Sequence, residues 1–169
     1  MDVETAIRSR RTHKAYKPEP VARETLEELL ELARWAPNHH LTNPWRFRVV
    51  GQRALERLKR AAGPEAGAKL DRAPTLVVCS CKLSGDAVQH EEDLHATAVA
   101  AYIVLLAAHA RGLAGYWRTP DVLRAEEGRA AVGLPDDEHF VSLLHLGRPI
   151  QEKQPPERAP AADLVTFLD

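Results

Sequence analysis

Residues 86–111 are the longest stretch of the chain with a helical pattern, and they constrain the fold more than any other segment. The second half of this stretch, residues 96–110, consists almost entirely of Ala, Val, Leu and Ile. A helix that is apolar on almost every side must be covered on almost every side, either by a large core or by a second subunit. Because the chain has only 169 residues, we expect a second subunit to supply part of the cover.

The order of helical and strand patterns indicates the α+β class. The expected helices are residues 2–10, 21–36, 54–62, 86–111 and 122–131, and the expected strands are residues 45–50, 74–81, 113–117 and 140–146. Gly63-Pro64 is expected to end the third helix, and Gly112 the fourth. The strands do not alternate with helices as regularly as in a doubly wound sheet, so α+β is favoured over α/β.

The length of the chain fits one domain, residues 1–169, that ends in an arm. Residues 151–160 hold three prolines and four charged side chains, a composition that extends over a surface. The chain then closes with apolar side chains at Leu164, Val165, Phe167 and Leu168. We therefore expect residues 150–169 to dock as an extended arm on another surface, such as that of a partner.

Composition excludes several classes of function. With 23 basic and 24 acidic residues, the chain lacks the basic excess of a general nucleic-acid-binding domain. No apolar run approaches the roughly 20 residues that span a bilayer, and the start of the chain lacks the apolar segment of a secretory signal. We therefore expect a cytoplasmic protein with no membrane contact. Cys79 and Cys81, two apart in an apolar run, are expected to be reduced core thiols.

The positive charge is concentrated near the start of the chain. Five basic side chains occur within the first seventeen residues: Arg8, Arg10, Arg11, Lys14 and Lys17. Together with Thr12, they supply guanidinium, ammonium and hydroxyl donors, which are the groups that bind a phosphate ester. The alternative is that the cluster is a solvated helix face.

Familiar catalytic motifs are missing. The sequence has no dinucleotide-binding or Walker-type glycine loop and no nucleophile elbow. His90 and His95 are five residues apart, about 140° around a helix, which disfavours a zincin-like site. His39-His40 has no Cys or carboxylate close in sequence, so we expect no metal site. Trp35, Trp45 and Trp117 could wall a planar ring or pack in the core, and core packing is favoured for Trp45.

Several short motifs, in this order, resemble those of the nitroreductase family of flavoproteins. They are Arg10-Arg11-Thr12-His13-Lys14-Ala15-Tyr16, Ala36-Pro37, Asn43-Pro44-Trp45-Arg46-Phe47-Arg48-Val49-Val50, residues 73–78, 112–115 and 146–149, and Arg158 ahead of Leu164-Val165. Together they span nearly the whole chain. The sequence is also similar to a short branch of NAD(P)H nitroreductases that share His39 and a Trp-Arg-Ser/Thr stretch at 117–119.

The resemblance implies an intertwined α+β homodimer with a central mixed, mostly antiparallel sheet flanked by helices and one FMN at each interface. The implied cofactor-binding residues are Arg10, Arg11, Thr12, Lys14, Pro37, Asn38, His39, Trp117, Arg118, Thr119 and Arg158. Arg10, Thr12 and Lys14 would contact the phosphate, ribityl chain and pyrimidine edge, and Arg11 would contribute mainly its backbone. The next three residues would line the cofactor. The residues from 117 to 119 would approach the isoalloxazine ring, and Arg158 would complete the phosphate clamp. Lys14 would act electrostatically, with no catalytic side chain.

Some positions depart from the family pattern. Thr12 stands where the family usually has Ser, and Asn43 stands where it has Gln. Larger members carry Asn at the position of Leu41, and His13 and Trp35 are also unusual. These departures bear on the choice of substrate more than on flavin binding.

The implied activity is an NAD(P)H oxidoreductase that reduces nitroaromatic or quinone-type acceptors, with both half-reactions at one flavin. One alternative is another redox reaction on the same scaffold, such as dehalogenation, flavin fragmentation or dehydrogenation. The others are a flavin carrier and a basic module that binds acidic proteins or nucleic acid. The expected partners are a second copy and a small-molecule acceptor.

Overall fold

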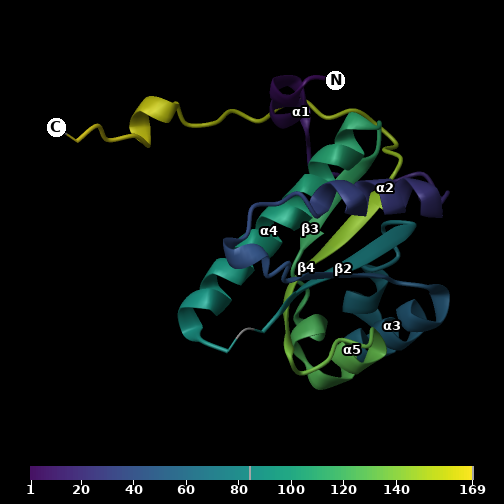
Figure 1. Cartoon of the computed structure of the whole chain (residues 1–169). Coiled ribbons are helices and arrows are strands. Elements are labelled where there is room, and N and C mark those ends of the chain that lie inside the picture. The colour runs from purple at the N-terminus through teal and green to yellow at the C-terminus, as the bar shows by residue number, and fades with distance from the viewer. Residues whose placement is uncertain (84, 169) are drawn as a thin grey trace.

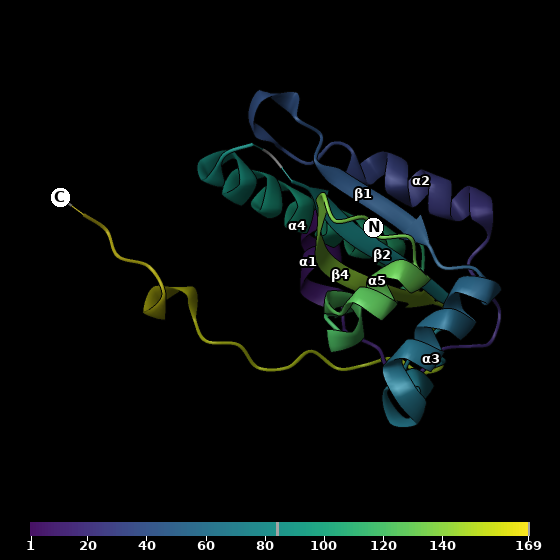
Figure 2. The same cartoon turned by 90° about the horizontal axis from the view of Figure 1, so that it is seen from below.

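The computed structural model describes residues 1–83 and 85–168 and is built around a four-stranded antiparallel sheet. Its strands are β1 (Trp45–Val49), β2 (Thr75–Lys82), β3 (Ala114–Arg118) and β4 (Glu138–Gly147). They lie in the order β1-β2-β4-β3, as Figures 1 and 2 show. The apolar, β-branched sequence of β2 places it in the interior of the sheet, where all but its last residue is buried.

Helices cover both faces of this sheet (Figure 2). They are α1 (Val3–Ser9), α2 (Arg23–Ala33), α3 (Gln52–Ala68), α4 (Ala87–Ala110) and α5 (Glu126–Ala131). Leu144 of β4 faces the core that α2 and α4 complete, and its neighbour Leu143 faces the core completed by α3 and α5. α1 packs against the C-terminal end of α4.

The α+β class and the order of the elements agree with the sequence predictions, but two helices differ in detail. The predicted end of the third helix is a kink at Gly63 (φ +75°), after which helical turns resume to the end of α3. The single helix predicted over residues 122–131 is a 3₁₀ turn, Asp121–Arg124, followed by α5, because Ala125 between them is extended. Gly112 follows α4 with φ +73°, as expected for a residue that ends a helix.

α4 is covered on only part of its surface. Ala100, Ala101 and Val104 are buried against the sheet and α2, whereas Val99 and Tyr102 are 40% and 37% exposed. The residues described here therefore leave an apolar strip of this helix uncovered.

The same helix bears on the expectation about membranes. An 18-residue window of α4 has a mean hydropathy of 1.4, so by length and composition the helix could cross a bilayer. Half of this window is buried inside the protein, and core helices commonly meet the same two criteria. Composition therefore does not distinguish a core helix from a span at this position.

Three predicted core side chains are buried. Trp45 lies in the core on the α4 side, and Cys79 and Cys81 are buried, unpaired thiols in β2. Burial raises the pKa of both thiols, so they are protonated at neutral pH.

The C-terminal arm extends away from the body of the molecule (Figures 1 and 2). Its apolar residues lie in solvent, with Leu164 77% and Phe167 91% exposed. Near its start, the Lys153 ammonium donates to the backbone oxygen of Thr12 over 2.8 Å. The apolar end of the arm is therefore uncovered within one chain, and its docking on another surface stays a prediction.

A partly buried ion pair links β1 and β4 across β2. The Arg48 guanidinium donates to both carboxylate oxygens of Glu138, at 2.7 and 2.9 Å, and the Ser80 hydroxyl donates to the same carboxylate at 2.5 Å. Burial alone would raise the pKa of Glu138, but the hydrogen bonds from Arg48 and Ser80 outweigh it and lower this pKa. The charged carboxylate therefore stabilises the folded state at pH values above the pKa that Glu138 has in the unfolded chain. This contribution is lost as the pH falls through the lower pKa of Glu138 in the folded state.

We expect Glu138→Gln to lower the free energy of unfolding at pH 7 by about 3 kcal/mol, because it leaves the Arg48 charge half-buried without its counterion. Urea denaturation from pH 7 to pH 3 should also show a smaller acid-induced loss of stability in the variant. Glu65→Gln, which removes an exposed partner of Lys69, is the control. It should change neither the free energy of unfolding at pH 7 nor the acid-induced loss of stability. Identical acid profiles for wild type and Glu138→Gln would contradict this assignment.

Candidate functional site

The basic segment after α1 runs beside the edge strand β3. The Thr12 backbone forms an isolated parallel bridge with Gly115, and the His13 N–H donates to the Gly115 oxygen over 3.2 Å. Further along, Tyr16 bridges Pro149, and its hydroxyl donates to the His13 oxygen over 2.7 Å. These bonds place the predicted phosphate-binding residues next to β3, whose last two residues are Trp117 and Arg118; Thr119 follows in the loop after the strand.

Arg10 and Arg11 keep unused hydrogen-bonding capacity. The Nε atoms of both guanidinium groups are buried and have no hydrogen-bond partner within the described residues. The Arg10 guanidinium lies over the ring of Tyr102 in α4, 5.7 Å from its centroid, and Arg11 donates to the Arg10 backbone oxygen. Exposed arginines such as Arg8 form ion pairs with nearby glutamates, whereas neither of these two pairs with a described carboxylate.

Lys14 and Arg118 converge on one aromatic ring. The Lys14 ammonium and the Arg118 guanidinium each lie 6.0 Å from the ring centroid of Tyr116 in β3. Arg118 also donates to the backbone oxygen of Lys69 over 3.1 Å. Tyr116 was missed by the sequence analysis; the strand alternation around Trp117 is the signal that could have placed it beside Arg118.

Trp117 points away from these two cations. It is half-buried and packs against the core on the α4 side of the sheet, opposite its cross-strand partner Leu144. Adjacent strand residues face opposite sides of a sheet, so the side chains of Arg118 and Trp117 lie on opposite faces of β3.

Two histidines lie close to the arginine cluster. The Ser9 hydroxyl donates to the Thr5 oxygen, so the 2.7 Å contact between Ser9 Oγ and His109 Nε2 is donated by the His109 ring. Burial lowers the pKa of His109, and so do Arg10 and Arg11. Burial, Lys153, His109 and Arg10 likewise lower the pKa of His13. Both rings are therefore neutral near pH 7, and the positive charge resides on the arginines and lysines.

The second group of predicted residues, Pro37, Asn38 and His39, lies near the start of α4. His39 Nδ1 contacts the Glu92 carboxylate at 2.7 Å, and the Asn38 side-chain oxygen accepts the Asn43 N–H at 2.9 Å. The loop is fastened to α4 where the Thr42 hydroxyl donates to Asp93 over 2.6 Å.

This loop is strained and carries a stacked pair of rings. His40, Leu41 and Asn43 all have positive φ angles, between 46° and 53°, which cost free energy in residues other than glycine. The hydrogen bonds to α4 hold this conformation. The rings of His39 and His40 stack with their centroids 3.8 Å apart.

The predicted site residues thus form two clusters in one chain. The Arg10 contact at Tyr102 and the His39 contact at Glu92 are ten residues apart on α4, about 15 Å along the helix. Arg158 is exposed on the arm, and no hydrogen bond or ion pair joins it to either cluster within the described residues. The structure brings Arg10, Arg11, Thr12 and Lys14 to β3 and leaves the loop of His39 and the arm apart.

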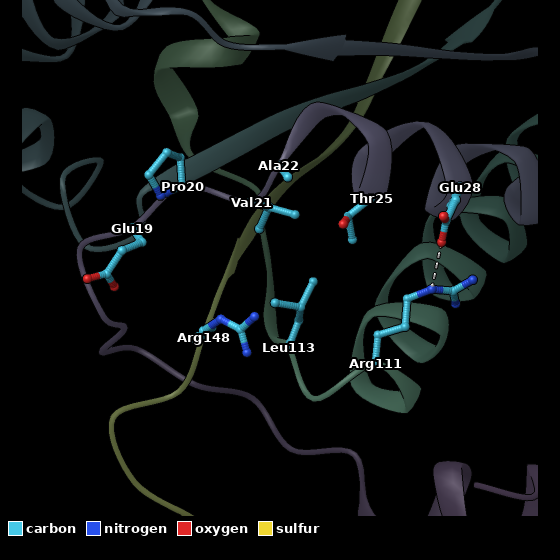
Figure 3. A pocket seen from close by; sticks show the side chains of 9 residues that line it. All are labelled: Glu19, Pro20, Val21, Ala22, Thr25, Glu28, Arg111, Leu113 and Arg148. Carbon is cyan, nitrogen blue, oxygen red and sulfur yellow. Dashed lines mark hydrogen bonds and ion pairs between the residues drawn. The ribbon is translucent and has the colours of Figure 1, made fainter.

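Two cavities within the described residues are lined by neither Arg10, Arg11, Thr12 and Lys14 nor the loop of His39. Figure 3 shows one of about 540 Å³ between the start of α2 and the end of α4, with the Arg111–Glu28 ion pair on its wall. None of the predicted cofactor-binding residues lines it. A second cavity, of about 520 Å³, lies between α3 and α5 and has Arg118 and Thr119 in its wall. No group of three or more possible metal ligands occurs within residues 1–83 and 85–168.

Comparison with known proteins identifies the family. The model of the nitroreductase family matches residues 7–148. YfhC of Bacillus subtilis, provisionally named an NAD(P)H nitroreductase, is 27% identical over 96% of this chain and 92% of its own length. A protein of Methanothermobacter thermautotrophicus, provisionally named an NADH dehydrogenase or NAD(P)H nitroreductase, is 31% identical over 89% of this chain and 79% of its own.

Solved structures share the fold. A nitroreductase-like protein from Bacillus cereus superposes with a TM-score of 0.90 at 22% identity, over 100% of this chain and 97% of the other. A protein from Desulfovibrio desulfuricans, provisionally named a nitroreductase and solved in complex with FMN, gives a TM-score of 0.83 at 27% identity, over 99% and 96% of the two chains. The fold and the order of motifs agree with the family match, and the chain belongs to the nitroreductase family.

Proposed function

We propose that the protein is an FMN-dependent NAD(P)H oxidoreductase that reduces nitroaromatic or quinone-type acceptors in two successive hydride-transfer half-reactions. The single observation that carries the proposal is the group of four cations beside β3, Arg10, Arg11, Lys14 and Arg118, none of which has a described carboxylate partner. A dependence on NAD(P)H is consistent with a cytoplasmic location.

The residues present fit a phosphorylated flavin. The buried, unpartnered Nε atoms of Arg10 and Arg11 can donate to phosphate oxygens, and unpaired guanidinium groups are the preferred phosphate ligands in proteins. The nearby Thr12 adds a hydroxyl donor. FMN, when bound, supplies the hydride chemistry. This chain supplies orientation, through the cationic clamp, and electrostatic stabilisation of negative charge, chiefly through Lys14.

We further propose that the enzyme is a homodimer whose sites are each built from both subunits. Three observations support this: the uncovered strip of α4, the uncovered apolar end of the arm, and the separation of the two predicted cofactor clusters within one chain. A second copy would cover the apolar strip of α4 and the apolar end of the arm. It would also bring the loop of Pro37, Asn38 and His39 to the clamp of its partner. Arg158 would reach a clamp by the same docking of the arm.

A direct experiment tests the proposed function. The purified protein should be yellow and show the visible spectrum of FMN, and NADH or NADPH should bleach it anaerobically. A nitrofuran or a quinone should then restore the colour and support steady-state turnover. Bound flavin that neither nicotinamide reduces would indicate a carrier. Protein that stays colourless after incubation with FMN would exclude both the oxidoreductase and the flavin carrier.

We expect Arg10→Ala to weaken FMN binding by about tenfold to a hundredfold, the loss of one charge-assisted contact of roughly 1.5–3 kcal/mol. Quenching of FMN fluorescence on titration measures the dissociation constant. Arg8→Ala is the matched control, because Arg8 lies two residues away and pairs with Glu4 on the exposed side of α1. Equal affinities of the two variants would place the phosphate clamp elsewhere.

We expect removal of residues 151–169 to weaken the dimer by at least about a hundredfold, because each apolar side chain that docks is worth roughly 1.5–3 kcal/mol. Sedimentation velocity over a concentration series measures the change. As a control, Glu152→Gln/Glu157→Gln alters the charge of the arm and keeps its apolar end. A full-length chain that is monomeric at all concentrations would refute the dimer, whatever the truncated chain does.

A further inference from the structure

The side of β3 that carries Tyr116 gathers positive charge without a counterion. The Lys14 ammonium and the Arg118 guanidinium each lie over the Tyr116 ring, 6.0 Å from its centroid. Neither forms an ion pair with a carboxylate in the described part of the chain, so the electron-rich face of the ring is the group that attracts both. The two positive charges repel each other, so other contacts must hold the two side chains in place.

A buried histidine stands behind the ring and adds no charge. His145 lies opposite Tyr116 across β3 and β4, with ring centroids 5.7 Å apart. It is fully buried, and both of its ring nitrogens lack a hydrogen-bond partner among the described residues. Burial lowers the pKa of His145 to about 3, with smaller effects from Arg118 and Arg72, so it is neutral at physiological pH. Tyr116 therefore packs beside a buried, neutral ring.

The backbone fixes how Lys14 reaches the ring. The bridge between Thr12 and Gly115 places the basic segment alongside β3, and the two bonds of Tyr16 hold the other side of Lys14. Arg118 belongs to β3 itself, and its guanidinium is held by its bond to the Lys69 oxygen. The two cations thus approach Tyr116 from separate, anchored segments.

We propose that Tyr116 is a positioning residue whose aromatic face holds the Lys14 ammonium and the Arg118 guanidinium together for the flavin. This inference rests on the proposed function and extends it to a residue outside the motif carried by residues 117–119. By keeping two cations in place, Tyr116 favours the extra negative charge that the flavin carries when reduced. The phenol hydroxyl has no part in this role, so a phenyl ring is sufficient.

The first test uses the protein without FMN. Reductive ¹³C-methylation labels lysine side chains and keeps their charge. The Lys14 signal, assigned by its absence in Lys14→Arg, should be displaced by the ring current of Tyr116. The displacement should persist in Tyr116→Phe and disappear in Tyr116→Leu and in Tyr116→Met, which covers the case in which one of them fails to fold. A Lys14 signal unmoved by loss of the ring would overturn the proposal.

The second test uses the FMN-loaded protein. Losing the ring should shift the midpoint potential of bound FMN to more negative values, equivalent to about a threefold to tenfold loss of preference for reduced over oxidised flavin. Tyr116→Phe should match the wild type. Phe140→Leu is the matched control, since Phe140 also carries a guanidinium over its ring, that of Arg124 at 5.8 Å, and should leave the potential unchanged.

A double-mutant cycle decides whether Tyr116 acts through Lys14. In a Lys14→Met background, Tyr116→Leu should shift the potential less than it does alone. Fully additive shifts, or an unshifted potential in Tyr116→Leu, would overturn the proposal. A protein that binds no FMN would refute the proposed function, while the displaced Lys14 signal would still report on the role of Tyr116.

Discussion

The packing of α4 against the sheet is the constraint on which the rest of the structure depends. Its small side chains, such as Ala100 and Ala101, let the helix lie close to β2 and β4, and they also bring α2 onto the same core. The same helix carries the contacts of both predicted cofactor clusters, Tyr102 near its end and Glu92 near its start. One element thus organises the core, the incomplete apolar surface and the spacing of the functional residues.

Periodicity predicted the order of the elements well, because apolar spacing reports directly on which side of a helix or strand is buried. It predicted boundaries less well where one residue decides the backbone. Gly63 bends α3 without ending it, and the extended Ala125 divides a helix that the pattern shows as continuous. Both outcomes are set by the backbone angles of a single residue, which apolar spacing does not report.

The sequence names the residues of the candidate site but does not show how they are arranged, and their role as a cofactor site stays a prediction. Motif order pointed to Arg10, Lys14 and Arg118, and the structure places them beside β3. The sequence did not reveal Tyr116, because an aromatic residue in a strand normally signals packing. Nor did it show that His39 lies along α4 from the clamp, since distance across a fold is set by the sheet and its helices.

The attachment of the basic segment has a consequence for how a bound cofactor would leave. Isolated bridges at Thr12 and Tyr16 and a few side-chain bonds hold this segment, whereas β3 beside it shares a continuous ladder with β4. A segment held by so few bonds opens at a lower free energy than the domain unfolds. If the proposed clamp holds the phosphate end of a flavin, that end would be released by local detachment of the basic segment, with the sheet and both cores left intact.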